Sequence, residues 1–171
     1  MGLSEKPLID SGKIQARVAE IGAEISRNYQ GRDLVLLVVL KGALVFAADL
    51  IRKITLDFNL SFIRARSYQG VASAGDVCFT LLPESSVRDR HILVVEDILD
   101  SGHTWVAIRA WLERRSPASI ALCALLDKPF RRVEEIRPDY VGFVIDDHFV
   151  VGYGLDLEER YRGLPDIHTV E

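Results

Sequence analysis

Residues 91–105 have the sequence HILVVEDILDSGHTW and change character twice along their length. Residues 92–95 form a short, β-branched-rich apolar run, which is typical of a strand buried on both faces of a parallel sheet. Three acidic side chains follow this run: Glu96, Asp97 and Asp100. From Trp105 onward the apolar residues recur at spacings of three and four, which predicts one face of a helix. The stretch therefore predicts a strand, an acidic loop and the start of a helix.

The loop between this strand and this helix has the properties of a ligand site. In open parallel sheets, ligands bind beyond the carboxyl ends of the strands, and a helix N-terminus offers free N–H groups to an anion. Carboxylates beside a bound phosphate require a divalent cation or ligand hydroxyls between them. A phosphorylated sugar with Mg²⁺ satisfies both conditions. The alternative is an ordinary turn with solvated acids, in which Ser101 or Thr104 only caps the helix; a cap needs one residue and leaves the rest of this polar stretch unexplained.

The composition predicts a single domain over residues 1–171. The chain is 49% hydrophobic, which suits one core at this length. Cys78 and Cys123 lie far apart without metal-ligand spacing, so we expect reduced thiols in a reducing compartment. Charged residues interrupt the first apolar positions, and the apolar run 34–40 is too short to span a membrane, so we expect a soluble, cytoplasmic protein without a signal peptide. A net charge of −4 disfavours a nucleic-acid partner and favours small ligands.

Strands and helices are expected to alternate along the chain. Apolar residues at helical spacing predict a helix over 14–25, with Asp10 and Ser11 as candidate caps and Gly31 as a stop. Further segments are expected in this order: strand 34–40, helix 43–51, a strand from 58 toward 66, loop 67–76, strands 77–82, 119–126 and 140–145, and a short apolar segment 149–154. This alternation predicts an α/β fold with a central, mostly parallel twisted sheet flanked by helices.

Polar residues follow three of the expected strands, at 41–42, 96–104 and 127–128. Because the carboxyl ends of parallel strands meet at one edge of a sheet, these residues are expected to converge there. The convergence would bring together a lysine, a phosphate-binding loop and carboxylates. It is the main argument from the residues themselves for an active site.

The segment VVEDILDSGHT, residues 94–104, resembles the phosphoribosyl pyrophosphate (PRPP) signature of the type I phosphoribosyltransferases. Four further segments resemble the hypoxanthine-guanine phosphoribosyltransferases in the same order, so that the resemblance covers nearly the whole chain: 40–42, 67–68, 127–128 and 139–156. The resemblance implies Mg²⁺-dependent transfer of ribose 5-phosphate from PRPP to hypoxanthine or guanine in purine salvage, giving IMP or GMP and pyrophosphate. It also implies a small hood formed by the terminal segments, and a homodimer or homotetramer.

The resemblance assigns the PRPP-binding residues. Glu96 and Asp97 would face the ribose hydroxyls and Mg²⁺, and Asp100 would lie near purine N7 as the proton acceptor, in keeping with chemistry that removes a proton as the glycosidic bond forms. A solvated acid at the helix entry is the alternative for Asp100. The 5-phosphate would be held by the whole loop: Asp100, Ser101, Gly102, His103 and Thr104. His103 departs from relatives that often have another residue here, including lysine, and lends less charge to the phosphate.

The pyrophosphate group is assigned to Lys41, Gly42 and Arg162, since a planar guanidinium suits phosphate oxygens. Family members often have a cis peptide before this lysine. Asp156 would serve a second Mg²⁺ beside the purine, although Asp156 and Arg162 lie in a charge-rich segment that is otherwise typical of solvated surface. Ser67 and Tyr68 resemble the start of a mobile lid over 67–76 that excludes water, and this lid is poorer in Ser and Thr than expected.

The resemblance places the purine pocket in the C-terminal part of the chain. Lys128 would hydrogen-bond the purine O6, Phe149 would stack on the base, and the main chain of Val150 would contact the base edge. The alternatives are a solvated lysine at a strand end and a phenylalanine in the core.

Two other functions are alternatives to the transferase. A Mg²⁺-dependent phosphohydrolase or phosphotransferase that forms an aspartyl-phosphate is disfavoured by the E-D-x-x-D spacing. A nucleic-acid-binding regulator of nucleotide synthesis built on the same fold is disfavoured by the acidic charge, and by the presence of Lys41, Asp100 and Lys128.

Overall fold

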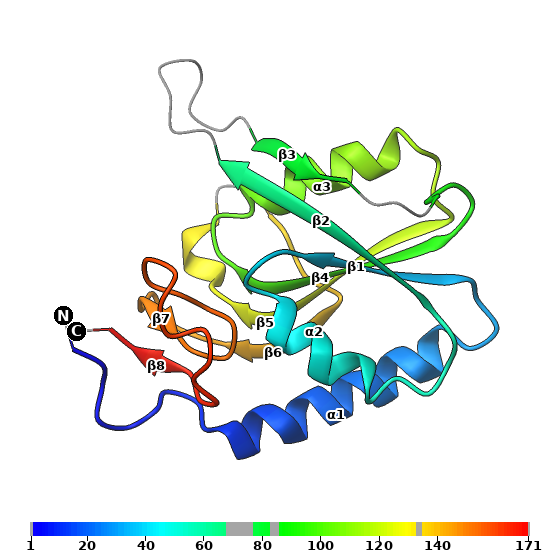
Figure 1. The fold of residues 1–171 in the computed structure, drawn as a ribbon. Coiled ribbons are helices and arrows are strands. Elements are labelled where there is room, and N and C mark those ends of the chain that lie inside the picture. Colours follow the sequence, from blue (N-terminus) through cyan, green and yellow to red (C-terminus); the bar gives the residue numbers. More distant parts are fainter. Residues whose placement is uncertain (1, 68–76, 83–85, 133–134, 171) are drawn as a thin grey trace.

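Six strands form one sheet in the order β3-β2-β1-β4-β5-β6. The structure is a computed structural model that describes residues 2–67, 77–82, 86–132 and 135–170 (Figure 1). The strands of this sheet have the following bounds: β1 Leu34–Val39, β2 Asn59–Ser67, β3 Val77–Leu81, β4 His91–Leu99, β5 Ser119–Asp127 and β6 Tyr140–Val144. All neighbouring strands are parallel except the β2–β3 pair. The predicted mostly parallel α/β fold is confirmed.

Helices cover both faces of the sheet. Helices α1 (Ser11–Asn28) and α2 (Leu44–Ile51) lie on one face and α3 (His103–Glu113) on the other (Figure 1). The central strands alternate between the two layers: Leu93 and Val95 of β4 join the core with α1 and α2, whereas Ile92 and Val94 join the core with α3. Both faces of β4 are therefore buried, as its apolar run predicted.

The first helix begins and packs as the sequence indicates. The Asp10 carboxylate accepts a hydrogen bond from the Lys13 N–H at 2.9 Å and caps α1. The apolar side chains at helical spacing are all fully buried: Ile14, Val18, Ile21 and Ile25. The backbone turns after Asn28, and Gly31 has a φ of 72°, which glycine adopts without strain. The helix packs against α2 and β6 and brings the N-terminal segment to one end of the sheet (Figure 1).

The strand β4 is longer than the sequence predicts. Residues 96–99 continue the parallel ladder with β5, where Glu96 pairs with Ala124 and Leu99 with Asp127. Glu96 and Asp97 therefore lie in the strand and not in a loop, so the expectation of an acidic loop directly after Val95 was wrong. The ladder with β5 holds these polar positions in extended conformation, which fixes the direction of both acidic side chains.

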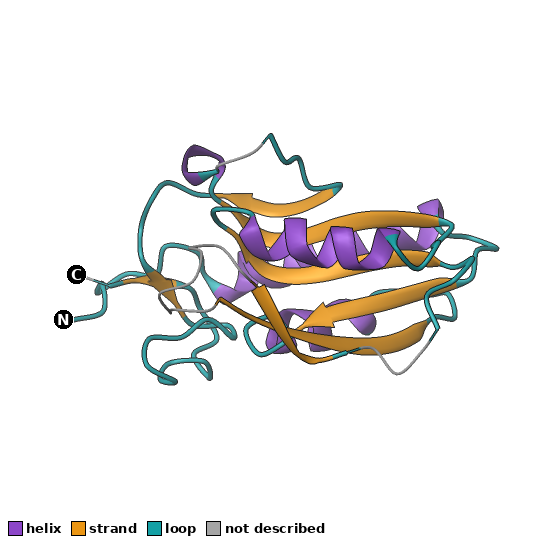
Figure 2. Ribbon diagram, turned by 90° about the horizontal axis from the view of Figure 1, so that it is seen from above, coloured by secondary structure: helices purple, strands orange, loops and turns teal. Residues whose placement is uncertain are grey.

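A small hood stands at the carboxyl end of the sheet. It contains the antiparallel pair β7 (Val150–Val151) and β8 (His168–Thr169). The N-terminal segment joins it through bridges between Leu3 and Val170 and between Ile9 and Ile167. The two termini lie side by side next to this hood in two views that differ by 90° (Figures 1 and 2). The resemblance to the family implied this hood of terminal segments.

Within the described residues, no helix has the length and apolar character needed to cross a membrane. Cys123 is a free, buried thiol whose pKa is raised by burial, as expected for a reduced cysteine. The predicted cytoplasmic location, and the predicted dimer or tetramer, stay predictions.

Candidate active site

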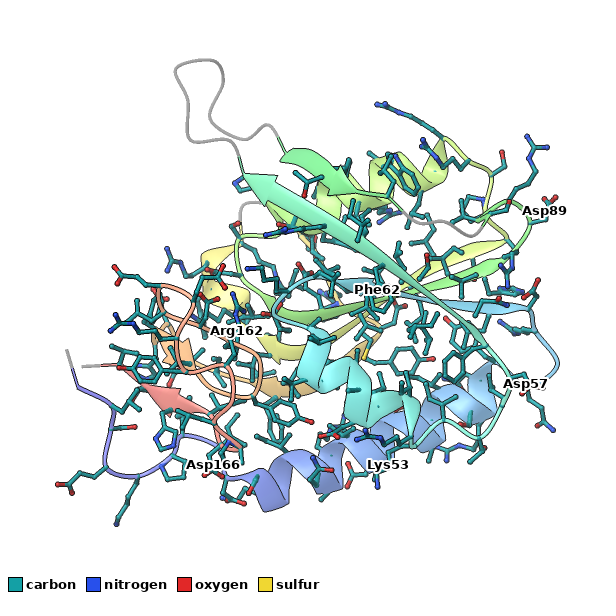
Figure 3. All side chains as sticks on the ribbon, viewed as in Figure 1. Lys53, Asp57, Phe62, Asp89, Arg162 and Asp166 are labelled. Carbon is teal, nitrogen blue, oxygen red and sulfur yellow. The ribbon has the colours of Figure 1, made fainter. Side chains whose placement is uncertain are left out.

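The three polar strand ends converge as predicted. Two of them, 41–42 and 96–104, line a cavity of about 350 Å³ at the carboxyl edge of the sheet, which we call the strand-end cavity. The third lies beside them, because the Lys128 N–H donates to the Leu99 carbonyl oxygen at 3.0 Å. Most of the residues assigned to PRPP line the strand-end cavity: Lys41, Gly42, Glu96, Asp97, Asp100, Ser101, Gly102, Thr104, Asp156 and Arg162. Figure 3 shows Arg162 where the hood meets this edge, and Asp57 and Asp89 at the far end of the molecule. The cavity is thus formed jointly by the sheet and the hood.

The two acids of β4 are held where their charge is costly. Glu96 is 6% exposed, and its Oε2 has no hydrogen-bond partner among the described residues. Burial, with the neighbouring Asp97 charge adding to it, raises the pKa of Glu96 to about 8. Burial also raises the pKa of Asp97 to about 6, against the opposing effect of backbone hydrogen bonds and Arg162. Both carboxyl groups would be stabilised in their charged form by a cation from outside the chain.

Close packing of backbone sets the shape of the cavity floor. The Leu40–Lys41 peptide is cis. A Cβ on Gly42 would overlap the Asp97 carboxylate, and a Cβ on Gly154 would overlap the Gly42 carbonyl oxygen. Gly154 has a φ of 101°, so glycine is also required there for its conformation. Only glycine allows the loop after β1, the strand β4 and the hood to approach so closely.

The N-terminus of α3 faces the strand-end cavity without a side-chain cap. Gly102 is the N-cap residue, in the left-handed conformation, and neither Ser101 nor Thr104 caps the helix. The alternative in which one of these hydroxyls serves only as a cap was therefore wrong. The free N–H groups of the first turn and the helix dipole favour an anion at this position. His103 begins the helix, is exposed and does not line the cavity.

The charged residues of the hood form ion pairs within the hood and with Lys41 in the loop after β1. Arg162 Nη2 lies 2.6 Å from Asp156 Oδ1, and Lys41 Nζ lies 2.8 Å from Glu159 Oε1. Arg162 Nη1 also donates to the Gly154 carbonyl oxygen at 2.7 Å. The side chains of Asp156 and Arg162 are only 29% and 27% exposed, so they are not the solvated surface charges that the sequence alone favoured.

A second cavity of about 520 Å³, the hood cavity, adjoins the first and contains every residue assigned to the purine. It is lined by residues from β4, the turn after β5 and the hood: Asp97, Ile98, Asp100, Lys128, Arg131, Asp147, Phe149, Val150, Leu155 and Asp156. Lys128 is 5% exposed, and its Nζ donates to the His148 carbonyl oxygen at 2.6 Å. Phe149 is 54% exposed. The alternatives of a solvated lysine and a core phenylalanine were both wrong.

Asp100 lies in the wall between the two cavities, because it lines both. Its Oδ1 lies 3.4 Å from Arg131 Nε, yet this buried oxygen has no hydrogen-bond partner among the described residues. The carboxylate is therefore placed next to a cation and still has an acceptor available. A ligand that extends from one cavity into the other would pass this oxygen.

Comparisons with known proteins agree with this geometry. The profile of the phosphoribosyl transferase domain matches residues 7–158. The hypoxanthine phosphoribosyltransferase of Escherichia coli (strain K12) is 42% identical over 166 residues, covering 95% of this chain and 93% of the relative. The chain belongs to the hypoxanthine phosphoribosyltransferase family. A crystal structure of a hypoxanthine-guanine phosphoribosyltransferase from Bacillus anthracis superimposes on this phosphoribosyltransferase with a TM-score of 0.93 and 40% identity, covering 98% of this chain and 99% of the other.

The acidic residues of the strand-end cavity suit a metal ion that is bound partly by protein carboxylates and partly by substrate phosphates. Among the residues that the structure describes, no group of three or more His, Cys, Asp or Glu side chains is arranged to bind a metal by itself. Mg²⁺ in proteins keeps several waters and uses one or two carboxylates together with substrate phosphates. The buried, unpartnered Oε2 of Glu96 fits such a partial site. Glu96, Asp97 and Asp156 as a joint metal site stay a prediction.

Several contacts of the site were missed from the sequence. Arg131 pairs with Asp100 and, at 3.2 Å, with Asp147, and Arg132 pairs with the buried Asp127 and donates to the Ile136 carbonyl oxygen. Pro129 at the start of the short 3₁₀ helix η1 (Pro129–Arg131) was the available signal, since a helical turn brings residue i+3 beside Lys128. The predicted lid lies outside the described residues, except for the backbone of Ser67 at the end of β2.

Proposed function

We propose that this phosphoribosyltransferase transfers ribose 5-phosphate from PRPP to hypoxanthine or guanine, giving IMP or GMP and pyrophosphate. The observation that carries the proposal is the position of Asp100 in the wall between the strand-end cavity and the hood cavity. A phosphoryl-ribose in the first and a purine in the second would meet beside its carboxylate.

The strand-end cavity would bind PRPP. The N-terminus of α3 and the hydroxyls of Ser101 and Thr104 would hold the 5-phosphate, with Lys41 and Arg162 on the pyrophosphate. Glu96 and Asp97 would face the ribose hydroxyls. Glu96, Asp97 and Asp156 would hold Mg²⁺, which would supply positive charge to the pyrophosphate. The hood would limit the access of water to the reacting carbon.

The hood cavity would bind and orient the base. Lys128 has three donors, of which one is used by the His148 carbonyl oxygen, so it retains donors for the purine O6. Phe149, whose side chain is exposed, would stack on the base, and Val150 lines the cavity from β7, where its main chain would contact the base edge. As purine N9 bonds to ribose C1′, the C1′–O bond to pyrophosphate breaks and the N7 proton passes to Asp100.

The proposal is tested by pyrophosphate release from PRPP with hypoxanthine, guanine, xanthine and adenine, each with and without Mg²⁺. We expect release with at least one 6-oxopurine and only in the presence of Mg²⁺. The substrate assignment would be contradicted if none of the four bases supported release, or if adenine alone did. The same assay separates the transferase from a phosphohydrolase, which would release phosphate or pyrophosphate without any base.

A further inference from the structure

Glu159 binds both cations of the proposed pyrophosphate site at once. Its Oε1 lies 2.8 Å from Lys41 Nζ and its Oε2 lies 3.1 Å from Arg162 Nη2. The hydrogen bond from Lys41, followed by that from Arg162, lowers the pKa of Glu159 and keeps the carboxylate charged. Two oxygens of one anionic group, each facing a different cation, reproduce what two phosphate oxygens would do in the same place.

The backbone that presents Glu159 adopts an uncommon turn. Leu157 and Arg160 form an antiparallel bridge, and the two residues between them, Glu158 and Glu159, have φ values of 51° and 63°. Positive φ at both central positions is the geometry of a type I′ turn, which strongly favours Asn and Gly. The Asp156 carboxylate stabilises the turn by accepting from the Glu159 N–H at 2.8 Å. The turn thus holds Glu159 against Lys41 in spite of the local preference of the residue.

We propose that Glu159 is an internal counter-anion that occupies Lys41 and Arg162 in the free enzyme and is displaced when pyrophosphate or the pyrophosphate group of PRPP binds. This inference rests on the proposed function, since it assigns Lys41 and Arg162 to pyrophosphate. Each ligand must replace two existing ion pairs, so Glu159 weakens the binding of substrate and of product alike. Its benefit is faster release of pyrophosphate after the transfer step.

The size of the effect follows from the exposure of these pairs. The side chains of Lys41 and Glu159 are 45% and 62% exposed, so each ion pair is screened and contributes modestly. Removing the charge of Glu159 should strengthen pyrophosphate binding by roughly 3- to 10-fold. The gain should shrink as ionic strength rises, because salt screens exposed charges. A residue that only supports the turn would produce no such salt-dependent gain in affinity.

The test compares Glu159→Gln with Glu158→Gln by calorimetric titration of magnesium pyrophosphate into the full chain. Both residues are exposed and occupy the same turn, but only Glu159 forms ion pairs among the described residues. We expect a 3- to 10-fold lower Kd and a similarly lower inhibition constant for pyrophosphate in Glu159→Gln, and wild-type values in Glu158→Gln. An equal or higher Kd in Glu159→Gln would overturn the proposal.

Two further measurements keep this result apart from the proposed function itself. A Lys41→Gln variant should lose pyrophosphate affinity, and wild-type enzyme should release pyrophosphate from PRPP with a 6-oxopurine. If both hold and Glu159→Gln binds as wild type, only the role of Glu159 fails. If wild-type enzyme neither binds pyrophosphate nor uses PRPP, the proposed function fails and the counter-anion role fails with it.

Discussion

The strand-end cavity and the hood cavity share Asp97, Ile98, Asp100 and Asp156, but they are constructed in different ways. The first is formed by backbone of the loops after β1 and β4, together with carboxylates that have raised pKa values. The second is formed largely by side chains from two segments: a buried lysine and an arginine from the turn after β5, and an exposed phenylalanine from the hood. Under the proposed function, the first cavity would bind a polyanion mainly with backbone, two cationic side chains and Mg²⁺, whereas the second would bind a neutral base mainly with side chains.

The largest expected effect is in the hood cavity. Lys128 is a pure donor, so it suits a carbonyl at purine C6 and meets the amine of adenine donor to donor. Sites with such a hydrogen bond discriminate by roughly 10⁴-fold, and we expect a hypoxanthine-to-adenine ratio of kcat/KM of this order. Lys128→Gln, whose amide both donates and accepts, should greatly reduce the ratio, mostly through lost hypoxanthine activity. Comparable use of adenine by the wild type would overturn the 6-oxopurine assignment. An unchanged ratio in the variant would move recognition to Val150 and the backbone.

The next effect concerns the shared wall. Asp100→Asn removes the proposed proton acceptor and should lower kcat by about 10²–10⁴, with little change in PRPP affinity. Asp147→Asn serves as the control for the charge beside Arg131, because Asp147 also pairs with Arg131 but lines only the hood cavity. Asp147 Oδ1 also lies 3.8 Å from Lys128 Nζ, so the KM for hypoxanthine is measured in the same variant to separate an effect on base binding from one on kcat. We expect Asp147→Asn to lower kcat far less. Equal losses in the two variants would show that the charge beside Arg131 matters and that proton transfer to Asp100 does not.

The third effect belongs to the strand-end cavity. Because Glu96, Asp97 and Asp156 would repel a polyanion, a chelator should weaken PRPP binding by at least about tenfold in calorimetry. Hypoxanthine is neutral, so its binding to the empty hood cavity involves no such repulsion. Its affinity should therefore change little when the chelator is added. Equal PRPP affinity with and without the chelator would show that PRPP binding in the strand-end cavity does not require Mg²⁺.

The smallest effect is on stability without ligands. The pKa of Glu96 is raised from 4.5 to about 8 in the folded chain, so between these values the folded state binds more protons than the unfolded state. Stability should therefore fall as pH rises from about 5 to 8. In Tm, each kcal/mol of this pH-dependent stability corresponds to about 2–4 °C. The fall in Tm between about pH 5 and 8 should therefore be smaller in Glu96→Gln than in the wild type, and unchanged in Glu158→Gln. If Tm depended on pH in the same way in the wild type and in Glu96→Gln, the raised pKa of the buried Glu96 carboxyl would be contradicted.

Local patterns of the sequence were sufficient for most of the fold. Buried strands are continuous apolar runs and α1 has a strict helical spacing, so β1, β4, β5 and α1 were predictable. The end of β4 was not, because polar residues that face a cavity resemble a loop until their pairing with β5 is known. The missing side-chain cap of α3 was equally hidden, since Ser101 and Thr104 both suit a cap.

The site was predictable where a single segment carries it. Residues 96–102 and 104 line the strand-end cavity, and they belong to the segment 94–104 that resembles a family motif. The contacts of Lys41 with Glu159 and of Asp100 with Arg131 were not found, because each joins separate segments, in the first case 118 positions apart. No periodicity or motif connects such pairs. The sequence was sufficient to identify candidate ligand-binding residues. Their ion-pair partners, such as Glu159 and Arg131, became known only from the structure.

The hood links the N-terminal segment to the base-binding region through residues 169–170. Ser4 N–H donates to the Thr169 carbonyl oxygen at 3.0 Å, Leu3 pairs with Val170, and the Val170 N–H donates to the Phe149 carbonyl oxygen at 2.9 Å. A purification tag or surface tether attached to either terminus would therefore pull on the segment that carries Phe149. Asp57 and Asp89 lie at the opposite end of the molecule in Figure 3. An attachment point near either residue would therefore exert no force on the segment that carries Phe149 in immobilised assays or fusion proteins.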